Sequence, residues 1–251
     1  MTDRLARDWD ELARTDAMFA ILSDGSKNGG RWSADEFFET GRQDFAATMS
    51  RAESWSLPMS RKRALDFGCG VGRVTQAVAE SFETSVGVDV SAEMVAQART
   101  YAIGNDQCEF IHNVDPDLRA FADAEFDLVY CNVVLQHLGR RRLAKSFIAE
   151  FCRVLSPGGL LVFQVPHSLP LRSRFQMRRR LHRLLRAVRV GPDMLASAGM
   201  YPISMLSVSE TDVDAIVTSA GHDLVQLDVD VSDAPGYPSA THWVTRRVVA
   251  T

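Results

Sequence analysis

The chain has 251 residues, of which 46% are hydrophobic and 24% charged, and its formal charge is −4. This length and composition fit one large α/β domain or two small domains and exclude a disordered or fibrous protein. No apolar run reaches the roughly 18 residues of a membrane span, and the start MTDRLARDWDELAR has no apolar signal core, so a cytoplasmic location is predicted. The weak negative charge argues against a general nucleic-acid binder.

The first sixty residues are predicted to form a helical lid region, residues 1–60. The loop SDGSKNGG separates two helical segments, and Ser33 begins the second because S-A-D-E is a capping-box pattern. Aromatic side chains in this region are predicted to close a pocket, with an aromatic patch that anchors the two helices as the alternative. They are Trp9, Trp32, Phe37 and Phe38, together with the backbone around Gly41.

From residue 61 onward, short apolar strands alternate with longer helices, which implies a parallel sheet covered on both faces. The predicted domain is 61–251, with an insertion at 168–206 that interrupts the alternation. Two closing strands, 222–231 and 242–249, are expected to pair antiparallel at one edge. The other predicted strands are 64–67, 85–90, 109–113, 126–132 and 160–165, and the predicted helices are 71–82, 92–103, 142–155 and 209–220.

The cysteines give no sign of disulfides or of a metal site. None of them forms a CxxC pair, and each lies in an apolar or Gly-rich context, which predicts reduced, buried thiols. No cluster has metal-ligand spacing, so no metal is predicted. The four are Cys69, Cys108, Cys131 and Cys152.

The strongest motif is ALDFGCGVGRVTQAV, which follows the first predicted strand and opens a helix. Gly68 and Gly70 permit a tight turn and the close approach of a ligand to the backbone. Asp89 lies 21 residues beyond Gly68, at the end of the second strand, where a carboxylate can accept hydrogen bonds from ribose hydroxyls. The alternative, a turn that only joins strand to helix, is disfavoured by this acid at the expected distance.

Two residues of the motif bear on which nucleoside binds there. A dinucleotide site requires G-x-G-x-x-G/A, but Arg73 takes the place of the third small residue. Asp66, two residues before the first glycine, would repel a pyrophosphate and attract an ammonium group. An amino-acid-bearing nucleoside such as S-adenosyl-L-methionine therefore fits better than NAD.

Four segments between about residues 60 and 166 resemble a known family. They are LDFGCGVGR, VGVDVS with the following Met94, EFDLVYCNVVLQHL and VLSPGGLLVFQVP. The chain resembles a bacterial class I S-adenosylmethionine-dependent methyltransferase of the small-molecule type. The resemblance implies a Rossmann-like, doubly wound sheet of seven strands with the last strand antiparallel, in agreement with the closing pair of strands.

The resemblance also implies cofactor contacts. Asp66 and the backbone of Gly68 and Gly70 would surround the methionine part of S-adenosylmethionine, and Arg73 would reach its carboxylate unless it faces solvent. Asp89 would bind the ribose. The remaining implied contacts lie along the adenine and under the cofactor's amino group: Val90, Met94, Asn113 with the adjacent Val114, and Asn132, with Asp115 as the alternative to Asn113.

Methyl transfer needs an aligned acceptor, a water-free site and, for a hydroxyl acceptor, a base. His137 follows the fourth strand at the expected mouth of the site and is the first candidate, with a structural histidine as the alternative. His167, just after the fifth strand, is the second candidate. His242 lies in a closing strand and His112 lies near the adenine end, so neither is favoured.

The insertion carries an unusual concentration of charge. Residues 172–189 hold eight arginines and no acid, which leaves 20 basic against 32 acidic residues, or −12, in the remainder. Leu181, Leu184, Leu185 and Val188 share one helical face. Three interpretations of this segment are open. Its guanidinium groups bind an anionic acceptor, or the helix lies on an anionic membrane and collects a lipid-linked acceptor. Alternatively, it is a solvated helix whose leucines pack on the domain or on a second copy of the chain in a homodimer.

The combined prediction is an S-adenosylmethionine-dependent O-methyltransferase that acts on a small molecule, with a hydroxyl of a sugar, glycolipid or natural product as the favoured acceptor. No nucleic-acid partner is expected, because aromatics are not interleaved with the arginines. Two other classes stay open: a nicotinamide-dependent oxidoreductase, and a catalytically silent cofactor-binding partner subunit.

Overall fold

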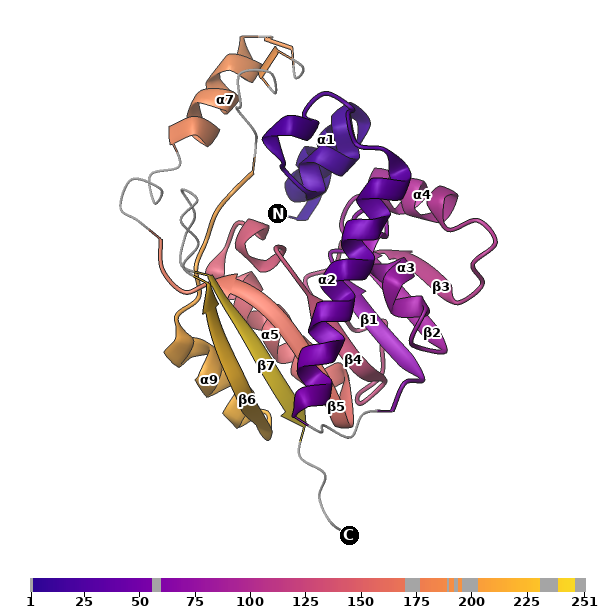
Figure 1. Cartoon of the computed structure of the whole chain (residues 1–251). Helices are drawn as coiled ribbons and strands as arrows, with labels where there is room; N and C mark the ends of the chain where they lie inside the picture. The colour runs from indigo at the N-terminus through magenta and orange to yellow at the C-terminus, as the bar shows by residue number, and fades with distance from the viewer. Residues whose placement is uncertain are drawn as a thin grey trace.

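A computed structural model describes residues 2–55, 60–169, 177–188, 190–191, 194–195, 203–230 and 239–246 (Figure 1). The elements in chain order are α1 Thr2–Ile21, η1 Gly25–Lys27, α2 Ala34–Ser54, β1 Arg63–Phe67, α3 Arg73–Ala79, β2 Thr84–Asp89, α4 Ala92–Tyr101, β3 Cys108–His112, β4 Phe126–Cys131, η2 Leu135–His137, α5 Arg141–Val154, β5 Leu155–Pro166, α7 Met177–Ala187, α9 Glu210–Ser219, β6 His222–Asp230 and β7 Ser239–Arg246.

The strands form one seven-stranded sheet in the order β3-β2-β1-β4-β5-β7-β6. Strands β1 to β5 are parallel, whereas β7 is antiparallel to both of its neighbours, β5 and β6. The predicted fold class is confirmed, including the antiparallel closing pair. The last strand, β7, inserts between β5 and β6, so β6 forms the edge. This order differs from the 3-2-1-4-5-6 order of dinucleotide-binding sheets.

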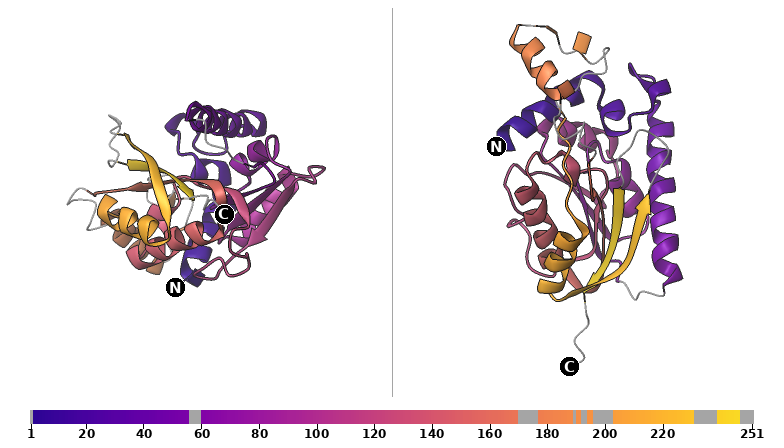
Figure 2. Two further views of the ribbon diagram at one scale, coloured as in Figure 1. Left: turned by 90° about the horizontal axis from the view of Figure 1, so that it is seen from below. Right: turned by 90° about the vertical axis from the view of Figure 1, so that its left-hand side faces the viewer.

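The sheet separates two apolar cores because successive side chains of a strand point to opposite faces. On β4, Val129 belongs to the core shared with α5 and α9, whereas its neighbour Leu128 belongs to the core shared with α2 and α3. On β5, Leu161 and Leu160 divide in the same way. Near-continuous apolar strands of this kind require helices on both faces, and Figure 2 shows the sheet between its helical layers.

Serine caps stabilise the starts of three predicted helices, including the one expected to begin at Ser33. Ser33, Ser91 and Ser209 each accept a hydrogen bond from the backbone N–H three residues later, which stabilises the starts of α2, α4 and α9. Some predicted boundaries were wrong. Helix α3 begins at Arg73 rather than at residue 71, because Gly72 before it has φ +84°, which is outside the helical region.

The closing half of the sheet also differs from the predicted boundaries. Strand β5 begins at Leu155, five residues early, because this residue already pairs with Phe126 of β4 ahead of an irregularity in the register. Strand β7 begins at Ser239 rather than at residue 242, since Ser239 pairs with both Pro166 and Asp230. Pairing with neighbouring strands therefore extends both strands beyond their apolar runs.

The described residues bear on several features that the composition raised. The cysteines are free, and three are buried while Cys108 is half-buried. Across the described ranges, no helix has the length and apolarity needed to cross a lipid bilayer. In the same ranges, histidine, cysteine and acidic side chains form no group of three or more that would hold a metal ion. The predicted division at residue 60 stays a prediction.

Candidate active site at the carboxyl edge of the sheet

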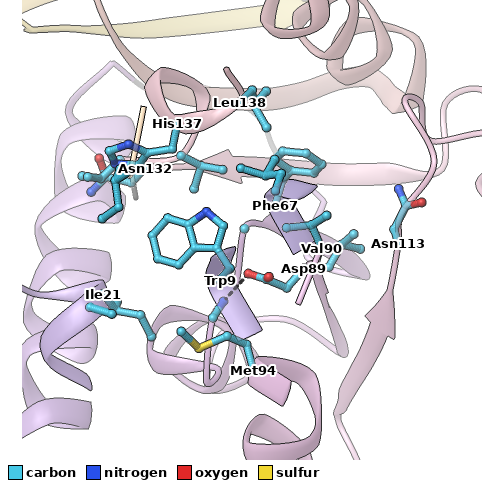
Figure 3. Close-up of a pocket in the computed structure, with 18 of the residues that line it drawn as sticks. Trp9, Ile21, Phe67, Asp89, Val90, Met94, Asn113, Asn132, His137 and Leu138 are labelled. Carbon is cyan, nitrogen blue, oxygen red and sulfur yellow. Dashed lines mark hydrogen bonds between the residues drawn. The ribbon is translucent and has the colours of Figure 1, made fainter. Parts of the chain in front are cut away.

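A cavity of about 400 Å³ lies where β1, β2, β3 and β4 end, and α1 covers it (Figure 3). Most of the predicted site residues line it. These are Gly68, Gly70, Arg73, Asp89, Val90, Met94, Asn113, Asn132 and His137. Asp66, Val114 and His167 are not among the lining residues.

The glycine turn is fixed to the end of β2 by Asp89. The Gly70 N–H donates to Oδ2 of Asp89 at 2.9 Å, and the Ser91 N–H donates to Oδ1 at 2.8 Å. Burial is the largest influence on this carboxyl and raises its pKa. Gly68 has φ +79°, and a Cβ at this position would lie 2.3 Å from Cγ2 of Val134. The close packing of the loop after β4 therefore requires glycine here.

Asp66 lies beneath the turn and not in the cavity. Its side chain is buried and accepts a hydrogen bond from Oγ1 of Thr75 at 2.7 Å. Burial raises the pKa of Asp66 to about 6, and the nearby carboxylate of Asp89 adds to the increase. The predicted role of Asp66 near the methionine part of a cofactor stays a prediction, and such a role would act through the electrostatic field and not by direct contact.

Arg73 faces the cavity and not the solvent, which answers the alternative left open by the sequence. Its Nη1 donates to Oδ2 of Asp44 at 2.7 Å and to Oγ1 of Thr40 at 3.0 Å. Its Nε is buried and has no hydrogen-bond partner among the described residues. A buried donor without a partner is costly, and this nitrogen has no exposed surface that a ligand in the cavity could contact directly.

The loop after β3 forms the far end of the cavity. Asn113 uses both ends of its amide within this loop, because Nδ2 donates to the carbonyl of Asp117 at 2.9 Å and Oδ1 accepts from the N–H of Asp115 at 2.9 Å. Asp115, the alternative to Asn113, also lines the cavity, whereas Val114 points away and is 40% exposed. The amide of Asn113 thus stabilises the conformation of the loop, and Asp115 of the same loop lines the cavity.

His137 lies across the cavity from Asp89, with the indole of Trp9 between them (Figure 3). Its Nδ1 lies 2.9 Å from the carbonyl oxygen of Ser204, whose hydroxyl donates back to the His137 carbonyl at 2.7 Å. A carbonyl only accepts, so Nδ1 must carry the proton and Nε2 must present a lone pair. Burial lowers the pKa of His137, which keeps the ring neutral. Trp9 contacts the ring edge-on at 5.8 Å between centroids.

The loop after β4 contains a strained residue that the sequence did not indicate. Val133 has φ +60°, a conformation that β-branched residues rarely adopt. Its N–H donates to Oε1 of Gln164 on β5 at 3.1 Å, which holds the strained peptide in place between Asn132 and Val134. Backbone strain of this kind clusters at functional sites.

The remaining predicted residues have other positions. His167 lies 3.2 Å from Oε1 of Glu210, at the start of α9. All four predicted lid aromatics, Trp9, Trp32, Phe37 and Phe38, belong to one apolar cluster with Met94, and of these four only Trp9 lines the cavity. Gly41 permits close packing of α2 on α3, because a Cβ there would lie 2.2 Å from the Arg73 carbonyl oxygen.

Asp10 links helix α1 to the start of α4, beside the cavity. Its Oδ1 accepts from Oγ of Ser91 at 2.6 Å and from the N–H of Glu93 at 3.1 Å. Both donors belong to the start of α4, where a carboxylate is favoured by the helix dipole. Sequence reasoning missed this residue and several others. Those that line the cavity include Leu5, Ile21, Asp44, Phe67, Val133, Val134, Leu138, Leu143, Phe147 and Ile203.

A seven-stranded sheet with an antiparallel last strand, and a cavity at the carboxyl ends of β1 to β4, define a Rossmann-like cofactor-binding protein. Residues 65–163 match the model of a family described as "Methyltransferase domain". This stretch runs from within β1 to within β5 and resembles a methyltransferase domain, and the strand order agrees with the fold of a class I S-adenosylmethionine-dependent methyltransferase.

Named relatives and solved structures agree with this assignment. The chain is 34% identical over 148 residues to a trans-aconitate 2-methyltransferase of Streptomyces avermitilis, covering 55% of this chain and 51% of that protein. It is 34% identical over 128 residues to a malonyl-[acyl-carrier protein] O-methyltransferase of Enterobacter lignolyticus, covering 50% and 45%. The chain thus spans about half the length of the curated relatives it matches.

The fold comparison extends over the whole chain. The crystal structure of magnesium protoporphyrin IX methyltransferase from Synechocystis PCC 6803 with bound SAH superposes with a TM-score of 0.63 at 17% identity, covering 98% of this chain and 99% of that one. At this identity the likeness concerns the fold alone. S-adenosylmethionine is the cofactor of the family, and Asp89, Arg73 and the apolar Met94 at the cavity lining fit a nucleoside that carries an amino acid.

Proposed function

We propose that the chain transfers the methyl group of S-adenosylmethionine to an oxygen of a small molecule, with a hydroxyl of a sugar, glycolipid or natural product as the acceptor. The observation that carries this proposal is the lone pair at Nε2 of His137, fixed by the hydrogen bond from Nδ1 to the Ser204 carbonyl. A hydroxyl must lose its proton as the methyl group is transferred, and a neutral imidazole at the cavity can take it.

The cofactor would supply an electrophilic methyl group next to a sulfonium. Residues of this chain would hold the cofactor at the carboxyl edge of the sheet. Asp89 would accept hydrogen bonds from its ribose hydroxyl groups, and Arg73 would attract its carboxylate. Met94 and Val90 would make apolar contacts with its adenine. Trp9 and α1 exclude water from the cavity, and His137 accepts the proton of the acceptor at Nε2. The burial that lowers the pKa of His137 keeps this nitrogen unprotonated near neutral pH.

The charge of the lining supports a neutral acceptor. Among the described lining residues Arg73 is the one with a permanent positive charge, and the carboxylate of Asp44 already pairs with it. Around His137 the lining is apolar, with Trp9, Leu138 and Ile203. A carboxylate acceptor would need a cation there and no base, so this half of the cavity favours a hydroxyl.

The proposal is tested with purified protein, labelled S-adenosylmethionine and a panel of hydroxyl and carboxylate acceptors. The relatives are named for trans-aconitate and malonyl-[acyl-carrier protein], so both belong in the panel. We expect turnover with a hydroxyl compound and a fall in kcat of about 10²- to 10⁴-fold for His137→Gln, with the Kd for S-adenosylhomocysteine changed little.

His167→Gln is the matched control, because this histidine lies beside Glu210 and does not line the cavity. It should keep full turnover. Turnover with carboxylic acids alone, independent of His137, would contradict the hydroxyl assignment. Retained cofactor binding without turnover on any acceptor would favour the catalytically silent alternative.

A further inference from the structure

Helix α7, in the insertion, exposes a row of apolar side chains to the solvent. Met177, Leu181, Leu184 and Val188 recur at spacings of four, three and four residues, so they lie in one row along the helix. Their exposed fractions are 66%, 47%, 66% and 71%. His182 is 7% exposed and lies about 140° around the helix from Met177, on the side that packs inward.

This arrangement is the reverse of an ordinary surface helix, which buries its leucines on the domain. Leu181 and Leu184 therefore do not pack on this chain's own domain in the described structure, whereas Leu185, the third leucine of the helix, is half-buried. Four large apolar side chains in a continuous row leave a surface that water solvates poorly, and such rows mark a docking surface.

The charge of the same segment indicates which kind of partner would bind to this surface. Five of the eleven residues of α7 are arginines and none is acidic. Arg180, next to the apolar row, is exposed. Arg186 is half-exposed and pairs with Glu11 of α1 at 3.3 Å. A surface that presents leucines among arginines complements an anionic bilayer, where the leucines enter the acyl boundary and the guanidinium groups meet lipid phosphates.

A second copy of the chain is a poorer occupant. In a two-fold dimer each face meets its own equivalent, so the arginines of one α7 would face those of the other. Residues 172–189 contain no acid that would compensate this repulsion. An anionic lipid surface meets both the apolar row and the positive charge without such a conflict.

We propose that α7 is a peripheral membrane-binding helix that docks the chain on bilayers containing anionic lipids. The placement of the helix suits this role, because α7 lies beside α1, at the opposite end of the molecule from the point where β7 ends (Figures 1 and 2). Helix α1 contributes Leu5 and Trp9 to the cavity, and Ile203, near the end of the same insertion, lines it as well. A bilayer bound by α7 would thus lie near the cavity.

The test is co-sedimentation of the full chain with vesicles of phosphatidylcholine alone and of phosphatidylcholine with about 30 mol% phosphatidylglycerol. We expect at least tenfold stronger partitioning onto the anionic vesicles and a marked decrease in high salt. The double variant L181S/L184S should lower partitioning at least tenfold, and Arg180→Glu should lower it about tenfold at low salt.

Matched controls separate this surface from general effects. Ile103→Ser removes an apolar side chain that is 81% exposed at the end of α4, and Lys62→Glu reverses an exposed charge before β1. Both controls should bind anionic vesicles as the parent chain does. Circular dichroism and thermal unfolding establish that each variant is folded, and the affinity for S-adenosylhomocysteine provides a readout of the cavity that does not depend on lipid.

Three results would overturn the proposal. The first is equal partitioning onto neutral and anionic vesicles, or none. The second is a loss in the two control variants as large as in L181S/L184S. The third is a self-association, measured by analytical ultracentrifugation, that L181S/L184S abolishes while vesicles bind no protein, since the apolar row would then join two copies of the chain.

Discussion

The two ends of the cavity are built in different ways. The cofactor end is formed by backbone turns and short side chains that directly follow β1, β2 and β3, so that its geometry follows from the sheet. The other end, where we propose that the acceptor binds and which we call the acceptor end, is formed by side chains from α1, from the loop after β4 and from residue 203, which are far apart in the sequence. The geometry of the cofactor end is therefore shared by proteins with this fold, whereas that of the acceptor end depends on how separate segments of this chain pack together.

The largest expected effect concerns the cofactor end. Asp89→Ala removes the carboxylate that accepts from Gly70 and Ser91 and that faces the cavity. Because hydrogen bonds to charged groups contribute about 1.5–3 kcal/mol each, affinity for S-adenosylhomocysteine should fall about 100-fold or more by calorimetry. Asp106→Ala, on an exposed turn, is the control and should bind normally. If Asp89→Ala bound S-adenosylhomocysteine with unchanged affinity, the assignment of Asp89 to the cofactor's ribose would be wrong.

Asp66→Asn tests the electrostatic role of the residue beneath the turn. The pKa of Asp66 is about 6 in the folded chain and 3.8 in the reference state, so the unfolded chain ionises it first as the pH rises. Stability from this group is therefore complete below pH 3.8 and is lost as the pH rises toward 6. At pH 7.5 the neutral asparagine should raise the free energy of unfolding by about 1–3 kcal/mol.

The same variant distinguishes stability from binding. If the carboxylate of Asp66 attracts the cofactor's ammonium group, Asp66→Asn weakens S-adenosylhomocysteine binding at pH 7.5 while it stabilises the ligand-free chain. The parent chain should also lose affinity between pH 7.5 and pH 5 to a greater extent than Asp66→Asn does. Equal pH dependence in the two proteins would show that Asp66 serves only to hold Thr75.

Asp10→Ala tests how firmly the lid is attached to the cofactor end. The change removes the acceptor for the Ser91 hydroxyl and the Glu93 N–H, and the loss of such a cap costs about 0.5–2 kcal/mol. Hydrogen exchange in α1 should accelerate about tenfold, with little change in the sheet. Asp35→Ala, in the exposed first turn of α2, is the control. No change in α1 exchange would mean that apolar packing alone holds the lid.

The smallest expected effect concerns the strained loop at the acceptor end. Asparagine tolerates positive φ, so Val133→Asn should raise the free energy of unfolding by about 1 kcal/mol in chemical denaturation. Val114→Asn is the control, because Val114 is also an exposed valine next to the cavity but has no positive φ. A destabilisation of both variants to the same degree would show that Val133 stores no strain.

The contrast between the two ends also explains what the sequence could predict. Strand ends are readable from local sequence, so Gly68, Gly70, Asp89 and Asn113 were placed correctly at the lining. The serine caps and the antiparallel closing pair of strands follow from equally local patterns. Asp66 shows the limit of this reasoning, because its proximity to the turn did not reveal that it packs beneath it.

The acceptor end was predicted only in part. His137 and Trp9 were expected there, but their contact joins segments that no sequence pattern links. Nothing in the valine of CNVV indicates φ +60°, since β-branched residues ordinarily exclude it. The outward apolar row of α7 was also hidden, because a helical period shows that a stripe exists and not which way it faces.

The most direct test of the central claim is calorimetric titration of the full chain with S-adenosylhomocysteine and, separately, with NAD. We expect S-adenosylhomocysteine to bind at one site and NAD not to bind, because Arg73 replaces the third small residue and β7 departs from the dinucleotide-binding strand order. Tight binding of NAD without affinity for S-adenosylhomocysteine would contradict it.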